Sequence, residues 1–322
     1  MEIRPVGATA VSAGRGRIVF SSSTNPSRVT EARDAKPQER LFSSMVSGVS
    51  GLAAALFATL FPADCRLCGS PLLNISRLPV CELCLADMRP ISEAICAICG
   101  ERMKGFAASY DECGETRCGL CRRLEPPFVR ASAYGSYEGG LRELIHLLKY
   151  EGVRPAAGVL GRMLAAAVTD LRPSFDENGM LVVPVPLHRS KSRQRGFNQA
   201  EEIARKALKQ IPSDCHLELA ADVLQRQRET QSQIGLSRHQ RRMNMRGAFA
   251  VKRPELVQGR EVLVVDDVFT TGTTVSECAR VLRRAGASRV FVATVARTLK
   301  VEAKFTAVPA ENESEAAMVA AG

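Results

Sequence analysis

The sequence predicts an α/β protein built on a parallel β-sheet with helices on both faces, preceded by a small cysteine-rich module. From residue 133 onward, apolar segments of strand length alternate with helical patterns, an order typical of parallel sheets. Eight of the 11 cysteines fall in four Cys-x-x-Cys pairs within residues 65–121. With 322 residues, the chain is long enough for about two domains.

The N-terminal part of the chain differs from the rest in composition. Residues 1–40 are rich in Ser, Arg, Ala and Pro without a sustained apolar period, so we expect a disordered extension. Residues 41–61 carry no charge, and large apolar residues recur at helical spacing with serines on the other face. Such a stretch is long enough to span a bilayer. Its many small and hydroxyl residues nevertheless favour an amphipathic helix over residues 41–62 rather than a membrane span.

The net charge of +10 is concentrated in one part of the chain. Residues 186–260 hold 16 Lys and Arg against 7 Asp and Glu, which accounts for nearly all of the excess. A basic region of this kind suits phosphorylated ligands or nucleic acid. A solvated surface without any ligand would explain the same composition.

The apolar patterns locate the strands and helices of the predicted sheet within residues 126–300. Strands are expected at the short apolar runs 133–137, 181–186, 261–265 and 289–296. Helices are expected at 141–148, 153–171, 199–209 and 274–285. Residues 301–322 are expected to form a flexible tail.

The most informative segment is VLVVDDVFTTGTT, residues 262–274. Its first four residues predict a buried strand, and Asp266 and Asp267 stand at the carboxyl end, where α/β sheets place ligand sites. A hydroxyl-rich turn then leads into a helix, and its residues are Thr270, Thr271, Gly272, Thr273 and Thr274. Backbone N–H groups and hydroxyls there can surround a phosphate, while the two acids accept hydrogen bonds from a ribose diol. The segment therefore fits a ribose 5-phosphate group, although a threonine-capped helix after an ordinary strand would look similar.

This segment closely resembles the 5-phosphoribosyl 1-pyrophosphate (PRPP) motif of type I phosphoribosyltransferases. Residues 183–200 resemble the pyrophosphate loop of those enzymes followed by a cation-rich stretch, and residues 230–242 resemble the mobile loop that closes over PRPP. Together with residues 141–152 and 246–249, the motifs resemble the ComF/GntX-like family of competence-associated proteins over roughly residues 60–300. The resemblance implies a type I phosphoribosyltransferase-like sheet in residues 126–300.

The resemblance also implies a role for each matching residue. Asp266 and Asp267 would be catalytic, because they would fix the ribose and favour the positive charge that develops on it as pyrophosphate leaves C1. The residues expected to bind PRPP are Thr270, Thr271, Gly272, Thr273, Thr274, Val185, Pro186, Arg195 and Arg238. Mg²⁺, held mainly by oxygens of the substrate, would neutralise the leaving group, and cations of the mobile loop would assist. No residue stands out as a general base.

Each of these stretches also has a simpler explanation. Pro184 and Pro186 could mark an edge strand. The cations of residues 189–195 could belong to a solvated loop, and residues 230–247 could be a structural linker. His188 could bond the neighbouring backbone instead of a ligand.

The cysteine pairs predict two structural Zn²⁺ sites in residues 63–125. The first two pairs are 12 residues apart and the last two are 18 apart, so each set can supply four thiolates to a tetrahedral ion. The predicted ligands are Cys65, Cys68, Cys81 and Cys84 at one site, and Cys96, Cys99, Cys118 and Cys121 at the other. This arrangement predicts a double zinc ribbon, although the pairs could also cross between sites, and Cys113 could replace Cys118. Cys215 and Cys278 are expected to be ordinary buried residues.

Because no signal peptide is evident, metal-bound thiolates in a reducing cytoplasm are expected rather than disulfides.

Three functions remain open from the sequence. The chain could be a phosphoribosyltransferase with an unidentified acceptor, a non-catalytic sensor of PRPP or a nucleotide, or an adaptor that binds single-stranded DNA. The family resemblance implies a link to natural transformation and to other DNA-uptake proteins. Aromatic residues make up only 5% of the chain and Trp is absent, so there are few platforms on which bases could stack. The intact acids and threonines favour the first two functions.

Overall fold

The computed structural model describes residues 63–72, 76–103, 116–176, 179–229 and 237–299. The chain divides into two compact units, Met1–Ala53 and Ala54–Gly322, and all described residues belong to the second. The predictions for residues 1–40, 41–62 and 301–322 therefore lie outside the described residues. Within the described parts of the chain, no helix is both long and apolar enough to cross a membrane.

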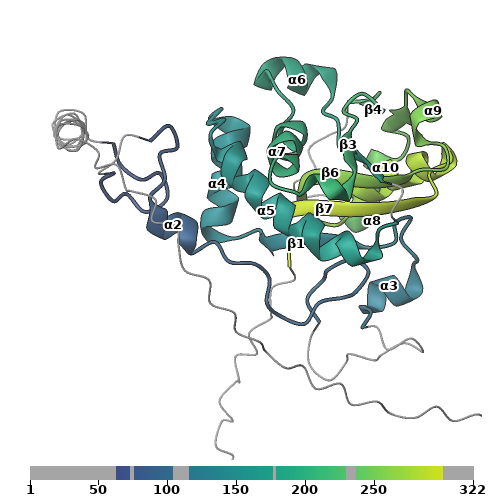
Figure 1. Cartoon of the computed structure of the whole chain (residues 1–322), viewed down its shortest axis with the longest axis horizontal. Coiled ribbons are helices and arrows are strands. Elements are labelled where there is room, and N and C mark those ends of the chain that lie inside the picture. Colours follow the sequence, from purple (N-terminus) through teal and green to yellow (C-terminus); the bar gives the residue numbers. More distant parts are fainter. Residues whose placement is uncertain (1–62, 73–75, 104–115, 177–178, 230–236, 300–322) are drawn as a thin grey trace, which may run out of the picture. The chain divides into compact units, whose positions relative to one another are not determined.

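A five-stranded parallel sheet forms the centre of the second unit (Figure 1). Its strands are β1 (Ala131–Ser136), β2 (Met180–Pro184), β3 (Leu217–Leu219), β6 (Glu261–Phe269) and β7 (Arg289–Arg297). Their spatial order is β1-β7-β6-β2-β3, and every neighbouring pair is parallel. The predicted α/β class is confirmed. The strand that carries the two adjacent carboxylates is the middle one, so its carboxyl end lies between those of β2 and β7.

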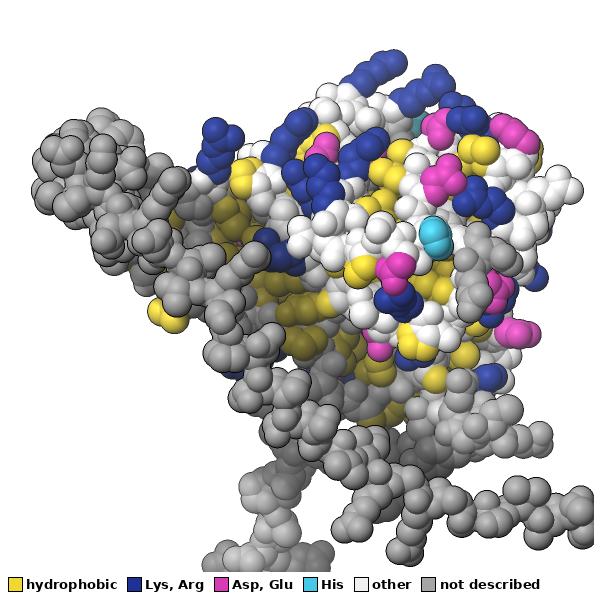
Figure 2. Space-filling view, viewed as in Figure 1, with side chains coloured by type: hydrophobic (Ala, Val, Ile, Leu, Met, Phe, Trp, Pro, Cys, Tyr) yellow, Lys and Arg dark blue, Asp and Glu magenta, His cyan; other side chains and the backbone are white. Residues whose placement is uncertain are grey.

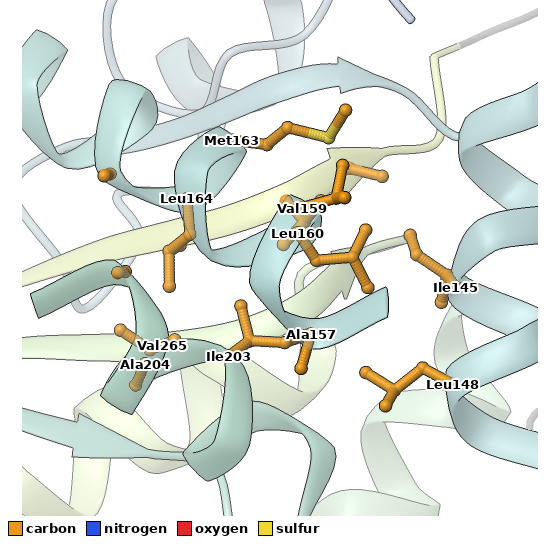
Figure 3. Packing of buried hydrophobic residues seen from close by; sticks show 14 of the residues in the cluster. Ile145, Leu148, Ala157, Val159, Leu160, Met163, Leu164, Ile203, Ala204 and Val265 are labelled. Carbon is orange, nitrogen blue, oxygen red and sulfur yellow. The ribbon is translucent and has the colours of Figure 1, made fainter. Parts of the chain in front are cut away.

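One face of the sheet is covered by α4 (Gly139–Tyr150), α5 (Ala156–Leu171) and α7 (Gln199–Leu208). Leu263 and Val265 of β6 point toward this face. A Cβ atom at Gly161 of α5 would lie 2.5 Å from Cβ of Lys206 in α7, so only glycine allows the two helices to approach this closely. Figure 3 shows the resulting packing, with Leu160 of α5 pointing toward Ile145 of α4.

The opposite face is covered by α8 (Arg238–Met245), α9 (Pro254–Val257) and α10 (Thr273–Arg284). Val262 and Val264 of β6 pack on this side. Side chains alternate between the two faces of a strand, so a strand that is covered on both faces must be apolar at every position. This explains the unbroken apolar run that begins β6.

The remaining elements are short. They are an antiparallel ribbon of β4 (Leu224–Arg226) and β5 (Phe249–Val251), helix α6 (Arg189–Arg195), and the 3₁₀ turns η2 (Arg172–Ser174) and η3 (Ser213–Cys215). The ribbon joins the α10 side of the sheet, because Leu224 and Phe249 belong to the same buried cluster as α10.

The cysteine module contributes α2 (Glu82–Ala86) and α3 (Gly119–Arg123), which begin directly after Cys81 and Cys118. The two cysteine clusters pack on opposite faces of the sheet. Cys65 belongs to the buried cluster of α4 and α5, whereas Cys96, Cys99 and Cys118 belong to the buried cluster of α10.

The structure differs from the sequence-based expectations at the end of β6, in two polar segments and at Cys215, and it also contains strands β3, β4 and β5, which were not expected. Strand β6 continues beyond residue 265 to Phe269, because its pairing with β7 continues to the register Phe269↔Arg297. The cation-rich stretch 189–195 is a helix rather than a loop, and residues 238–245 form a second helix, capped by Ser237 and Gln240 in a reciprocal capping box. Cys278 is buried as expected, but Cys215 is partly exposed.

Candidate functional site

The two adjacent carboxylates lie inside β6, three and two residues before its last residue. Asp267 is 4% exposed, and Asp266 is partly buried. The Asp267 backbone N–H donates to Oδ1 of Asp266 over 2.9 Å, which fixes the orientation of that carboxylate. Burial raises the pKa of Asp266 well above its usual value, and the negative charge of Asp267 is the second cause of this increase. A ligand that donates hydrogen bonds to the ionised form would offset this penalty.

Lys149 is a site residue that sequence reasoning missed. It lies in the last turn of α4, and its ammonium forms an ion pair with Oδ2 of Asp267. Burial alone would lower the pKa of Lys149, but the Asp267 carboxylate more than offsets this effect, so that this pKa lies above its usual value. The sequence held a signal, because Leu141, Ile145 and Lys149 follow one another at four-residue spacing and place a lysine on the buried stripe of the helix.

The threonine-rich turn joins the end of β6 to the start of α10. Gly272 is the N-cap residue of α10, with φ of +74°. A Cβ atom there would lie 2.5 Å from Cζ of Phe269, so both the backbone conformation and the close contact require glycine. The hydroxyls of Thr271 and Thr273 are 2.8 Å apart, and Thr270 is exposed. Thr274 follows in the first turn of α10, so several hydroxyls lie at a helix N-terminus, where anions bind.

The predicted pyrophosphate loop lies beside this site. Val185 N–H donates to the carbonyl of Val265 over 2.8 Å, which extends the β2–β6 ladder by one residue, and Pro186 follows. Asn198 donates its side-chain amide to the Val185 carbonyl over 3.1 Å. His188 caps α6 by accepting a hydrogen bond from the Ser190 backbone N–H. This agrees with the alternative that His188 bonds the neighbouring backbone instead of a ligand.

The two arginines expected to bind PRPP have different positions. Arg195 ends α6, donates to Oε1 of Gln199 and lies over the ring of Tyr150 at 5.7 Å from its centroid. Tyr150 adjoins Lys149, so Arg195 contacts the helix end that supplies the Asp267 partner. Arg238 is the first residue of α8, but its side chain lies outside the described parts, as does the rest of the predicted mobile loop at residues 230–236.

A second cation that the sequence analysis did not predict lies near Asp266. Arg226 of β4 has its guanidinium 5.6 Å from the centroid of the Phe249 ring. Burial lowers the pKa of Arg226, while the charges of Cys278 and Asp266 oppose that decrease. No local pattern in the sequence distinguishes this arginine from its exposed neighbours.

The eight paired cysteines form two clusters, each with its four sulfur atoms within 4.8 Å of one another. The members are Cys65, Cys68, Cys81 and Cys84 in the first centre, and Cys96, Cys99, Cys118 and Cys121 in the second. The pairs therefore do not cross between centres, and Cys113 lies outside the described residues.

The geometry and chemistry of both clusters fit zinc. In the first centre the Sγ atoms of Cys68 and Cys81 are 3.7 Å apart and those of Cys65 and Cys84 are 3.9 Å apart. In the second centre the Sγ atoms of Cys99 and Cys118 are 3.8 Å apart. Four Zn–S bonds of about 2.3 Å at tetrahedral angles would separate the sulfur atoms by about 3.8 Å. Burial raises the pKa of the Cys65 thiol, but hydrogen bonds from backbone N–H groups, led by that of Cys81, lower it to about 6. This favours the thiolate that binds metal.

Comparison with known proteins agrees with this division of the chain. The family described as Double zinc ribbon domain matches residues 56–122, and the family described as Phosphoribosyl transferase domain matches residues 193–309. Among solved structures, a hypoxanthine phosphoribosyltransferase from Staphylococcus aureus is 11% identical, with a TM-score of 0.28, over 44% of this chain and 67% of its own. That likeness is too weak to support an argument.

Curated relatives cover most of the chain. The DNA utilization protein YhgH of Escherichia coli (strain K12) is 32% identical over 239 residues, which cover 74% of this chain and 98% of the relative. Competence protein F of Haemophilus influenzae is 29% identical, over 70% of this chain and 93% of its own length. Competence protein ComFC of Bacillus subtilis is 25% identical, over 64% and 79%. The chain therefore belongs to the ComF/GntX-like family, whose relatives are named for competence and DNA utilization and which here combines a double zinc ribbon with a phosphoribosyltransferase domain.

Proposed function

We propose that this protein binds PRPP with Mg²⁺ at the carboxyl end of β6 and transfers the phosphoribosyl group to an acceptor that is not yet identified. The observation that carries the proposal is the arrangement of one continuous segment. Asp266 and Asp267 lie in the middle strand, and Gly272 starts the adjoining helix with hydroxyls around its N-terminus. The match to the Phosphoribosyl transferase domain includes this whole segment. The names of the relatives support a link to DNA uptake.

In this proposal the two carboxylates hold the ribose. The ammonium of Lys149 pairs with Oδ2 of Asp267 and would keep that carboxylate ionised as an acceptor for a sugar hydroxyl. Hydrogen bonds from the ribose would also stabilise the ionised form of Asp266, which burial disfavours. Two carboxylates close to the sugar favour the positive charge that develops there as the bond from C1 to pyrophosphate breaks.

The remaining groups hold the two ends of the substrate. N–H groups and hydroxyls at residues 270–274 would hold the 5-phosphate. Val185 and Pro186 line the pyrophosphate side, and we assign Arg195 and Arg238 to the same end. Mg²⁺ bound with the substrate would supply charge neutralisation of the leaving group. We assign Lys149 to keeping Asp267 ionised.

The test is direct. Purified protein is incubated with PRPP, Mg²⁺ and a panel of bases and nucleic acids, and pyrophosphate release is followed. In parallel, PRPP with Mg²⁺ should raise the unfolding temperature, because a ligand that binds only the folded state stabilises it. Asp266→Asn combined with Asp267→Asn should abolish both effects. Asp170→Asn combined with Asp214→Asn, at two exposed acids, is the matched control. A double variant at Asp266 and Asp267 that kept the wild-type thermal shift would refute the ribose site.

A second candidate function is binding of single-stranded DNA. Figure 2 shows Lys and Arg side chains gathered at the top of the view, over α6. Three cations of this helix, Arg189, Lys191 and Arg193, are exposed. Exposed cations next to the predicted pyrophosphate loop could also hold the phosphates of a nucleic acid strand. DNA and PRPP would then compete, which distinguishes this function from a DNA surface elsewhere on the protein.

We further propose that the protein works in a reducing compartment, the cytoplasm. The cysteines of both clusters are free thiols placed for metal binding rather than disulfides.

A further inference from the structure

Arg297, the last residue of β7, lies between the second zinc centre and the strand that leads to the threonine-rich turn. The residue is 4% exposed. Its Nη2 atom is 3.7 Å from Sγ of Cys99, a ligand of the second centre, and 3.3 Å from a carboxylate oxygen of Glu101. Its guanidinium carbon is also 4.2 Å from the centroid of the Phe269 ring. One side chain therefore contacts both the metal cluster and the end of β6.

Phe269 transmits this contact to the turn. Its ring occupies the space next to Gly272, where a Cβ atom would be only 2.5 Å away. The ring also meets that of Phe128 edge-on, with 6.2 Å between centroids. The Phe269 carbonyl accepts a hydrogen bond from Thr298 over 3.0 Å, so the residue is fixed through both its backbone and its ring. The ring therefore packs directly against Gly272, whose conformation begins helix α10.

The position of Arg297 depends on its acidic partners. Its Nε and Nη1 atoms are buried without a hydrogen-bond partner among the described residues. A buried guanidinium is stable only where nearby negative charge or an aromatic face compensates for its lost hydration. Here that compensation comes from Glu101, from Phe269 and from Cys99. Four thiolates around one Zn²⁺ carry a formal charge of about −2, so the loaded centre is a strong partner for a cation.

The space beside this contact is not filled by other side chains. A cavity of about 240 Å³ is lined by Cys99 and Cys121 of the second centre, by Arg297 and Phe269, and by residues 271–273 of the turn. Because the turn and the metal centre face a shared cavity, close packing does not join them there. The contact through Arg297 and Phe269 is therefore a specific connection between the two.

The first zinc centre offers an internal comparison. Its buried ligand Cys65 packs with α4 and α5, on the face of the sheet opposite α10. The carbonyl of Met88, which follows α2 of this centre, accepts from the Tyr134 hydroxyl over 2.9 Å, and Tyr134 belongs to β1, an edge strand. The first centre is thus attached to β1, which pairs with β7, but on the face of the sheet opposite the contact of Arg297 with Phe269.

We propose that the second zinc centre holds the threonine-rich turn in its ligand-binding conformation through Arg297 and Phe269, so that zinc at this centre and a phosphoribosyl ligand at the turn strengthen each other's binding. Arg297 is in this sense a positioning residue that acts through Phe269. The proposal rests on the proposed function, since it requires that the turn bind the phosphate of PRPP or of ribose 5-phosphate. Coupling between two binding equilibria is reciprocal, so the effect can be measured from the metal side.

The experiment measures zinc loss at each centre separately. The full chain, loaded with zinc, is exposed to a zinc-selective chelator that leaves Mg²⁺ in place, with or without saturating PRPP or ribose 5-phosphate. Cysteines freed at successive times are alkylated, and peptide mass spectrometry assigns each modified cysteine to its centre. We expect either ligand to slow alkylation of Cys96, Cys99, Cys118 and Cys121 by about fivefold or more, in the range typical of allosteric coupling. Alkylation of Cys65, Cys68, Cys81 and Cys84 should not change.

Variants test the connecting residue. Arg297→Met keeps an unbranched side chain but removes the charge and the donors, so it should weaken ribose 5-phosphate binding about fivefold or more and abolish the protection of the second centre. Arg283→Met is the matched control. Arg283 lies in the last turn of α10 and donates to the carbonyl of Ala287, at the end of the helix opposite the turn, so its loss should leave protection intact. If Arg297→Met does not fold, the wild-type chelation experiment still decides the question.

The outcomes separate this proposal from the proposed function. If ligand raises the unfolding temperature but the second centre loses zinc at an unchanged rate, the coupling is refuted and PRPP binding stands. If both centres are protected equally, the effect is general stabilisation, and the specific connection is refuted. If neither ligand binds in the thermal assay, the proposed function fails, and the coupling fails with it.

Discussion

Breaking the ion pair between Lys149 and Asp267 should destabilise the folded protein by about 3 kcal/mol. The side chains of Lys149 and Asp267 are only 15% and 5% exposed, so water solvates neither charge well. Removing one partner of a buried pair leaves the other charge uncompensated, at a cost of about 3–5 kcal/mol. The partial exposure of Lys149 places Lys149→Met at the lower end of that range. Urea unfolding of the zinc-loaded protein without PRPP measures the free energy directly.

A double-mutant cycle isolates the pair. Lys149→Met, Asp267→Asn and the combined variant should show a coupling free energy of about 2 kcal/mol or more, because the combined variant leaves no unpaired charge. The matched control is the exposed pair Arg253–Asp222, whose side chains are 46% and 55% exposed. Arg253→Met should change stability far less than Lys149→Met, because exposed ion pairs contribute little to folding. The reasoning is refuted if Lys149→Met is as mild as Arg253→Met and the cycle is additive.

Further predictions concern the zinc centres, the Asp266 carboxyl and the exposed cations of α6. Metal analysis of protein purified without chelator should find two Zn²⁺ per chain, and a single ion would contradict the assignment of two complete centres. Replacing one ligand by serine should lower folding stability, because structural zinc contributes directly to it. Asp266→Asn should stabilise the protein near pH 7, since burial raises the pKa of Asp266 and its ionised form opposes folding. That opposition grows as pH rises above the unfolded value of about 3.9, so the gain should vanish in more acidic solution, and a pH-independent gain would contradict the assignment. Affinity for single-stranded DNA should fall as the salt concentration rises. In a plot of log affinity against log salt concentration, the double variant Arg189→Gln with Arg193→Gln should have a slope shallower by about 1.4. The control pair Lys209→Gln with Arg284→Gln should leave the slope unchanged, and an equal effect of both pairs would argue against a DNA site on α6.

Local patterns in the sequence were enough to predict the α/β sheet and the zinc ribbon. The run from Val262 to Val265 is apolar on both faces, which in a chain of alternating strands and helices predicts a strand covered on both sides. The Cys-x-x-Cys spacing predicted the eight metal ligands, and the structure then excluded the crossed pairing that the spacing had left open. The sequence also placed Gly272 in a turn that leads into a helix, and in the structure this residue is the N-cap of α10, with φ of +74°.

The extent of β6 and the helices at residues 189–195 and 238–245 required the structure. Asp266 and Asp267 have low strand propensity, and they remain in the strand because β7 continues to pair alongside them. The helix at residues 189–195 has no apolar stripe from which it could be predicted. It begins after His188, whose side chain caps its N-terminus. Polar segments such as this are helical because of capping and neighbouring contacts rather than periodicity.

Only the tertiary structure decided which distant side chains meet at the site. Lys149 joins Asp267 because α4 packs against the sheet with its last turn near the carboxyl end of β6. Arg297 reaches Cys99 across 198 positions of sequence, because the second zinc centre packs on the face of the sheet that also carries α10. Composition and periodicity depend on residues that are neighbours along the chain. Contacts such as these depend on the order of strands in the sheet and on which face each helix covers, so no local pattern contains them.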